Sequence, residues 1–200
     1  MRVGSLTLSA LAHQQSDAVS MTNDFDPDTW TPEEEERSQE LMAELGLALF
    51  VAQAVEYGLV SLLAAAAMRD NREIPGDEIR KIMDTRYHHT LGKLVREAAG
   101  KVDLSDHALG FLEIALPARN WLAHHFYRQY APAALSEPIH LRAITLIRHA
   151  RELFEATLDE LGKETVRILG EAGISQEEAQ QAAEAAMRSV TGMDLSPPQF

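Results

Sequence analysis

The chain of 200 residues is long enough for one domain that buries its own hydrophobic core. It contains no cysteine, which excludes disulfides, thiol catalysis and cysteine-based zinc sites. The formal net charge of −13 argues against nucleic-acid binding over the whole surface, so the distribution of that charge matters. No apolar run approaches the length of a membrane span, so we expect a cytoplasmic protein with no membrane partner.

The acidic residues are concentrated at the two ends of the sequence. Residues 1–36 hold eight acids and one base, and residues 171–200 hold five acids and one base. Residues 37–170 between them carry a net charge of only −2, and no acid occurs over 114–136. The middle of the chain therefore permits contact with a polyanion such as RNA, whereas its ends do not favour it.

The two ends of the chain show weak structural signals. Residues 1–31 mix serine, threonine, aspartate and glutamine with little periodicity, which predicts a disordered N-terminal tail. The first twelve residues make a poor signal peptide, and Met21 is an alternative start. A capping-box pattern at Ser175 and Glu178 predicts a C-terminal helix over 173–191, followed by a loose tail over 192–200.

Residues 32–172 predict a helical bundle that opens with a long helix from Pro32 to about Arg69. Thr31 is a suitable N-cap, Pro32 suits the first helical position, and the acids that follow favour the positive end of the helix dipole. Apolar residues recur along one face of this helix: Leu41, Leu45, Leu49, Ala52, Leu59 and Leu63.

Glu56 falls on the apolar face of this first helix. A carboxylate in that position requires a partner, and an inward-reaching cation such as Arg119 is a candidate. A structural ion pair and a catalytic contact are both open interpretations. Gly46 and Gly58 weaken the same helix, which predicts close contacts with another helix at both positions.

Three further helices follow the turn over 70–76. We predict them over 77–99, from Ser105 to about Tyr130, and from Ser136 to about Gly170. No strand pattern occurs. The sequence therefore predicts an all-α fold, an up-and-down four-helix bundle with an additional C-terminal helix.

The histidines outside the third helix do not form a metal site by spacing. Residues 86–89 read Arg-Tyr-His-His, but adjacent histidines on a helix diverge by about 100° and cannot both bind one ion. The pair Glu137 and His140 lacks the second copy that a di-iron bundle needs. We therefore expect solvated or interfacial histidines, no metal and no cofactor.

A nine-residue stretch that begins at Arg119 reads Arg-Asn-Trp-Leu-Ala-His-His-Phe-Tyr. At about 100° per residue, His125 falls on the apolar side of the helix. Asn120, His124 and Tyr127 fall together on the other side, with Arg119 at its edge. We therefore expect His125 to point inward and His124 to point outward.

This stretch resembles the motif of the HEPN superfamily, all-helical domains many of which are metal-independent endoribonucleases. The family pattern is an arginine, four to six residues and a histidine. Arg119 and His124 match it with four residues between them, and Asn120 is the polar residue usual after the arginine. Residues 52–59 are similar to the first long helix of such domains, and the resemblance covers roughly residues 32–170.

The resemblance implies cleavage of RNA by attack of its own 2′-hydroxyl group. It implies that His124 is the acid or base and that Arg119 clamps the phosphate, while Asn120 orients His124 or a phosphate oxygen. Tyr127 and Glu56 are candidates for substrate contact or support. The implied partners are RNA, a second copy of the chain and, in a toxin or defence role, an antitoxin.

In one toxin-like branch of that superfamily, a partner nucleotidyltransferase modifies a tyrosine two residues after the histidine. Here that position is Phe126, and Tyr127 follows one place later, so this chain departs from the pattern. The alternative interpretation is a non-catalytic HEPN-like module that binds nucleotide, RNA or a partner protein. A purely structural role for the motif is also open.

Overall fold

The computed structural model describes residues 30–175, 177–178 and 181. Over this part of the chain no strand occurs, and the all-α fold is confirmed. The predicted tails and most of the predicted C-terminal helix lie outside the described residues. The helices are α1 (Pro32–Asp70), α2 (Gly76–Tyr87), α3 (Leu91–Lys101), α4 (Asp106–His124), α5 (Phe126–Tyr130), the 3-10 helix η3 (Ala131–Ala134) and α6 (Glu137–Glu171).

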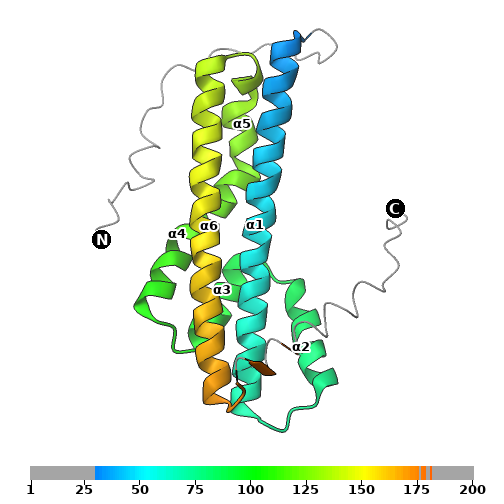
Figure 1. Ribbon diagram of the computed structural model, residues 1–200, viewed down its shortest axis with the longest axis vertical. Coiled ribbons are helices and arrows are strands. Elements are labelled where there is room, and N and C mark those ends of the chain that lie inside the picture. The colour runs from blue at the N-terminus through cyan, green and yellow to red at the C-terminus, as the bar shows by residue number, and fades with distance from the viewer. Residues whose placement is uncertain (1–29, 176, 179–180, 182–200) are drawn as a thin grey trace.

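The two long helices α1 and α6 lie side by side and run in the same direction (Figure 1). An ion pair joins Glu40 to His140 near the start of both helices, and another joins Arg69 to Glu171 near the end of both. In an up-and-down bundle the first and fourth helices are antiparallel. The chain therefore does not adopt the predicted order of helix directions.

Helix α4 provides the return path between these two parallel helices. Its N-cap, Ser105, lies beside the second half of α6, where its backbone N–H donates to Glu164 at 3.1 Å. Helices α5 and η3 continue to the start of α1, where Arg37 donates to the carbonyl of Ala134 at 2.8 Å. Helices α2 and α3 have only 12 and 11 residues, too short to form full-length layers of a bundle.

The helix starts follow their sequence signals closely. The Thr31 side chain accepts from the Glu34 backbone N–H, and the Glu34 carboxylate accepts from the Thr31 N–H, which completes a capping box. Ser105 caps α4 with its side chain, as predicted. Ser175 and Glu178 exchange the same reciprocal bonds, as the capping-box pattern predicts.

Two predicted helices are each broken in two. The helix predicted over 77–99 stops at Tyr87, and α3 starts after Thr90, whose backbone is extended. The helix predicted to reach residue 130 stops at His124. Each break redirects the chain so that the next helix turns its apolar residues into the core. Periodicity cannot reveal such a break, because both halves keep helical spacing. The side chains brought inward are Leu91, Leu94 and Ala98 of α3 and Phe126 and Tyr130 of α5.

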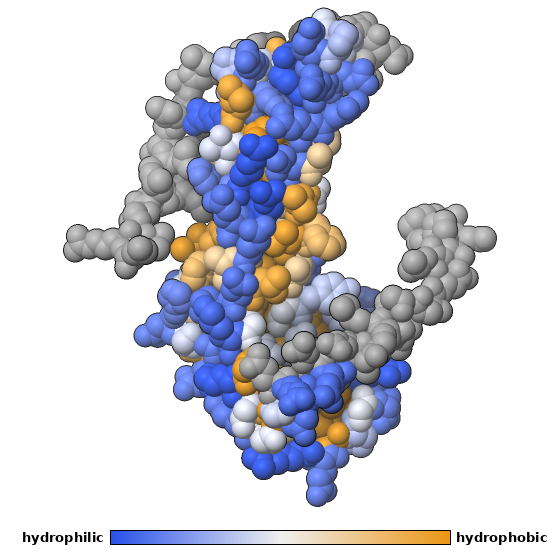
Figure 2. Space-filling model, in the orientation of Figure 1, coloured by the Kyte–Doolittle hydropathy of each residue, from blue (hydrophilic) through white to orange (hydrophobic). Residues whose placement is uncertain are grey.

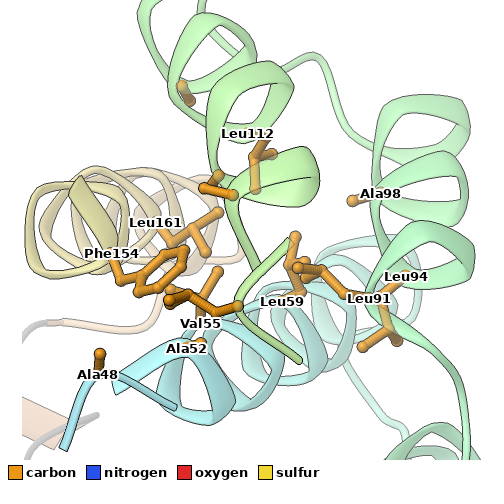
Figure 3. Packing of buried hydrophobic residues seen from close by; sticks show 14 of the residues in the cluster. Ala48, Ala52, Val55, Leu59, Leu91, Leu94, Ala98, Leu112, Phe154 and Leu161 are labelled. Carbon is orange, nitrogen blue, oxygen red and sulfur yellow. The ribbon is translucent and has the colours of Figure 1, made fainter. Parts of the chain in front are cut away.

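The hydrophobic core lies along α1 (Figure 3). Val55 and Leu59 of α1 meet Phe154 and Leu161 of α6, while Leu112 of α4 closes one side. The apolar face predicted for α1 is buried or partly buried along its length. Towards its end, all residues over 62–66 are buried, because other helices surround this part of α1.

The two glycines of α1 differ in their surroundings. A Cβ atom at Gly58 would lie 3.1 Å from Leu158 Cδ1 and 3.3 Å from Leu161 Cδ1, so α6 packs closely there. A Cβ atom at Gly46 would meet nothing within 4 Å. The predicted close contact is therefore present at Gly58, and the prediction is wrong at Gly46.

By length and composition alone, α1 could cross a membrane, which corrects the expectation that no run approaches that length. Of its most apolar stretch, 44% is buried inside the fold. A core helix of a soluble protein meets the same criterion, because a helix surrounded by others is apolar on most sides. The composition of α1 is therefore weak evidence for a membrane span.

Candidate active site

The residues of the motif lie at the end of α4 and the start of α5. The side chains of Asn120 and His124 are exposed, as is that of Tyr127, which is 60% exposed. In the part of the chain that the structure describes, none of these three side chains forms a hydrogen bond or ion pair. His124 therefore points outward, as predicted, and its ring is accessible to a ligand.

Arg119 reaches sideways from α4 to the middle of α1. Its Nη2 atom lies 3.1 Å from Glu56 Oε1, and the two side chains are 28% and 23% exposed. The pairing that the sequence suggested is therefore present. Glu56 Oε1 is buried and has no partner with hydrogen-bond geometry, so the contact is an ion pair only. A guanidinium has five N–H donors, so the Arg119 donors that do not face Glu56 remain available to a ligand.

His125 is exposed, so the prediction that it points inward is wrong. The helix ends at this residue, with φ −121° and ψ −28°, and its N–H donates to the carbonyl of Trp121 at 2.9 Å. Phe126 takes the inward position and is 1% exposed. Its ring packs edge-on against Trp121 with the centroids 5.5 Å apart. These aromatic rings anchor the end of the motif in the core.

Of the arginines in α5 and α6, some are held by ion pairs and others remain available to a polyanion. Arg148 and Arg151 of α6 both pair with Glu44 of α1, at 2.7 and 3.1 Å. Arg128 of α5 and Arg142 of α6 are exposed and form no ion pair within the described residues. The acid-free segment of the sequence thus leaves Arg128 as its exposed, unpaired arginine, because Arg119 is paired with Glu56.

A pocket of about 230 Å³ opens beside Glu56. No sequence pattern predicts this pocket, although the run Arg-Tyr-His-His over 86–89 marks a polar segment. The break after Tyr87 brings His89 against α1, and this tertiary contact forms the pocket. The lining residues are Gln53, Glu56, Tyr57 and Val60 of α1, Arg86 and Tyr87 of α2, His89 of the turn, and Leu94 of α3.

The far wall of this pocket is held by an ion pair between Arg86 and Glu97. Arg86 Nε and Nη2 donate to Glu97 Oε1 at 3.0 and 2.5 Å. Burial opposes ionisation of Glu97, but hydrogen bonds and charges from Arg86 and Lys101 outweigh it and lower the pKa of this carboxyl. Burial also raises the pKa of the Tyr87 phenol, with smaller contributions from Tyr57 and Asp84, so Tyr87 is neutral at pH 7.

The histidines that were considered as metal ligands have other contacts. His89 Nε2 lies 2.8 Å from Lys93 Nζ, and His140 Nε2 lies 2.9 Å from Glu40 Oε2. Within the described ranges, no group of three or more histidine or acidic residues is placed to hold a metal ion. The arrangement of polar side chains is suited instead to hydrogen bonding and proton transfer.

Comparisons with protein-family models, with curated proteins and with solved structures find no match. The resemblance to the HEPN superfamily therefore rests on the motif residues alone.

Proposed function

We propose that this chain is a metal-independent endoribonuclease of HEPN type that acts in the cytoplasm. The observation that carries the proposal is the end of α4, where Arg119 pairs with Glu56 and the two polar residues of the motif that follow in the same helix are exposed. Asn120 and His124 have no partner in the described chain, so a ligand can use them. An oriented guanidinium and an accessible imidazole supply a phosphate clamp and a proton carrier.

The proposed reaction breaks the bond between phosphorus and the 5′-oxygen. The 2′-oxygen of the preceding ribose attacks the phosphorus as its proton passes to a base, while an acid protonates the leaving 5′-oxygen. The products are a 2′,3′-cyclic phosphate and a 5′-hydroxyl. Arg119 stabilises the charge on the phosphorane, and His124 carries one of the two protons, because an imidazole ring can both accept and donate a proton.

Two proton transfers by histidine require two histidines, so we propose that two copies of the chain form the active unit. Helix α1 exposes Leu47 and Phe50, which are 46 and 67% exposed. Figure 2 shows hydrophobic side chains gathered near the middle of this face of the molecule. A large exposed apolar patch is typical of a protein interface, and a second copy is the partner that the mechanism requires.

Two further residues have supporting roles in this proposal. Glu56 fixes the direction of the Arg119 guanidinium, so that less rotational freedom is lost when a phosphate binds. Tyr127 is exposed two residues after the break at His125 and offers an aromatic ring on which an unpaired base can stack.

The alternative is a non-catalytic helical module that binds nucleotide, RNA or a partner protein. The observation that favours it is the same ion pair, because Glu56 already compensates the charge of Arg119. A toxin with an antitoxin or nucleotidyltransferase partner is a more specific form of the enzyme proposal. Toxicity on expression that His124→Ala removes would support this form, and equal toxicity of both chains would contradict it.

The test compares native protein with His124→Ala, Arg119→Ala and the matched control His125→Ala on mixed RNAs in excess EDTA. We expect the native protein to leave cyclic-phosphate ends. His124→Ala should cut at least about 100-fold more slowly, which is the usual contribution of a general acid or base. His125→Ala should cut at nearly the native rate, because the exposed side chain of His125 makes no described contact.

Two outcomes would overturn the proposal. No cutting by native protein, where a known ribonuclease works, would leave the non-catalytic module as the better conclusion. Equal loss in His124→Ala and His125→Ala would show that the end of α4 matters structurally and that His124 has no special part. Circular dichroism of each variant separates lost folding from lost chemistry.

A further inference from the structure

We propose that the pocket beside Glu56 binds a guanine base. The binding of guanine depends only on the residues of the pocket. The role of the bound guanine in selecting the position at which RNA is cut rests on the proposed function. In that role, the base belongs to the nucleotide whose phosphate Arg119 holds. Glu56 connects the two, because it lines the pocket and pairs with Arg119 at 3.1 Å.

The size and walls of the pocket suit a single planar ring system. Its volume of about 230 Å³ is below the roughly 300–1,000 Å³ of pockets that hold drug-sized ligands. Tyr57 and Tyr87 contribute neighbouring rings, with centroids 4.9 Å apart and planes tilted by 49°. These side chains are 58 and 42% exposed, so an entering base can stack on one of them.

Glu56 supplies the acceptor for the edge of the base. Its Oε1 atom lies next to Arg119 and is buried, while no described hydrogen bond uses Oε2. A carboxylate that is partly buried and lacks hydrogen bonds binds N–H donors strongly, because it gives up little hydration on binding. A base with two adjacent N–H groups would donate hydrogen bonds to the Glu56 carboxylate.

His89 supplies a donor at the same pocket. Lys93 is a donor only and lies 2.8 Å from His89 Nε2, so Nε2 is the acceptor and the ring proton is on Nδ1. This Nδ1 is buried without a hydrogen-bond partner, and Glu97 Oε2 is 3.6 Å from it. A carbonyl oxygen on the ligand would give this buried N–H the acceptor that the described chain does not.

The charge around the pocket favours a nucleotide over a cationic ligand. Two carboxylates and three cations line it or contact its lining side chains, so the local balance is positive. An amine or polyamine would be repelled, whereas a base that carries a phosphate is attracted. These groups are Glu56, Glu97, Arg86, Lys93 and Arg119.

Guanine is the base that matches this pair of groups best. Its N1–H and N2–H donors lie side by side and can both point to the Glu56 carboxylate, and its O6 can accept from His89. Adenine and cytosine present a single amino group, and uracil presents a single ring N–H. Glu56 should therefore prefer guanine over each of the other bases.

The test measures binding of the four nucleoside 3′-monophosphates by calorimetry, since these ligands contain no bond to be cut. We expect guanosine 3′-monophosphate to bind native protein about tenfold more tightly than the others, the usual scale for a paired base edge. Glu56→Gln should lose this preference. Arg119→Gln, the matched control, breaks the same ion pair but keeps the carboxylate, so its preference for guanine should persist.

A second measurement on native protein avoids any effect of substitution on folding. Guanosine 3′-monophosphate should shift the NMR signals of the Tyr57 and Tyr87 rings and leave those of Tyr130 in the core unchanged. Equal affinity for all four nucleotides, no binding at millimolar concentration, or an unchanged preference in Glu56→Gln would overturn the proposal. RNA cutting without guanine binding would refute this pocket alone, and guanine binding without cutting would refute the ribonuclease alone.

Discussion

Arg119 forms an ion pair with Glu56 before any ligand binds. A substitution at either position therefore affects both the ion pair and the binding of a ligand. The two residues are 63 positions apart in the sequence, on α4 and α1, and both side chains are about one quarter exposed. An ion pair in such a setting is screened only in part by water. Loss of activity in a variant of Arg119 can therefore combine lost phosphate binding with a less stable fold.

A double-mutant cycle separates these two effects. We expect Arg119→Gln and Glu56→Gln each to lower the free energy of unfolding, with a coupling of about 0.5–1 kcal/mol, near the upper range for partly exposed ion pairs. Urea denaturation of the native, single and double variants measures it. A coupling of zero would mean that the ion pair does not contribute in solution, and that Arg119 is available to a phosphate at no cost.

The outcomes at His124 and His125 show how far single residues can be predicted. The helical spacing placed both side chains, and it was correct for His124 because α4 continues to that residue. It was wrong for His125, because the helix stops there and Phe126 enters the core. Spacing is informative only while the backbone stays helical.

The packing of α1 against α6 can be tested with a matched pair of glycines. Gly46→Ala should raise the free energy of unfolding by about 1 kcal/mol, because alanine favours a helix and its Cβ meets no neighbour. Gly58→Ala should be less stable than Gly46→Ala by about 1 kcal/mol or more, because its Cβ overpacks Leu158 and Leu161. Thermal unfolding gives both values, and equal stabilisation would contradict the close approach.

The junction between α4 and α6 predicts a loss of stability in acid. Glu164 is 6% exposed and accepts from the Ser105 N–H and from Arg167. Burial opposes its charge, but these hydrogen bonds and the charge of Arg167 outweigh burial and lower its pKa below 4.5. The carboxylate therefore stabilises the fold fully above the unfolded-state pKa, and this contribution is lost as pH falls through the folded-state pKa.

The variant Glu164→Gln isolates this contribution. At pH 7 we expect it to be less stable than native protein by about 1–3 kcal/mol, as for a lost hydrogen bond to a charged group. Below pH 4.5 the difference should shrink, because the carboxyl of the unfolded chain then binds a proton, and it should vanish once the pH is also below the lowered folded-state pKa. Urea denaturation across this range measures the difference, and a gap that stays constant with pH would contradict the assignment.

The breaks in the helices matter more for function than their exact lengths. The turn after Tyr87 forms the pocket, and the break at His125 anchors the motif in the core. Neither break contains proline or a strong turn sequence. The burial of apolar residues in the core determines where the two helices break, and this burial depends on the other helices.

At the level of the whole molecule, the parallel arrangement of α1 and α6 leaves part of α1 uncovered. Phe50 is 67% exposed on this face, and we propose that a second copy covers it. Phe50→Asp should convert a dimer into a monomer, because a carboxylate would be buried without a partner at the interface. Val166→Asp is the control, since Val166 is 44% exposed near the end of α6.

Analytical ultracentrifugation of the three proteins gives the result. Native protein and Val166→Asp should sediment as dimers, and Phe50→Asp should be a monomer with greatly reduced RNA cutting. A native monomer at micromolar concentration would refute the dimer. A Phe50→Asp dimer would place the interface on another surface of the molecule.

Local sequence patterns were enough to predict the helical class, the starts of α1 and α4 and the outward position of His124. These features depend on caps and spacings that operate within a few residues. The sequence also suggested the pairing of Glu56 with Arg119, because a carboxylate on an apolar face needs a cation. The helix directions, the two breaks, the exposure of His125 and the pocket could not be predicted in this way and depend on the packed fold. Each of these depends on contacts between distant parts of the chain, whose balance of burial and backbone freedom no local pattern contains.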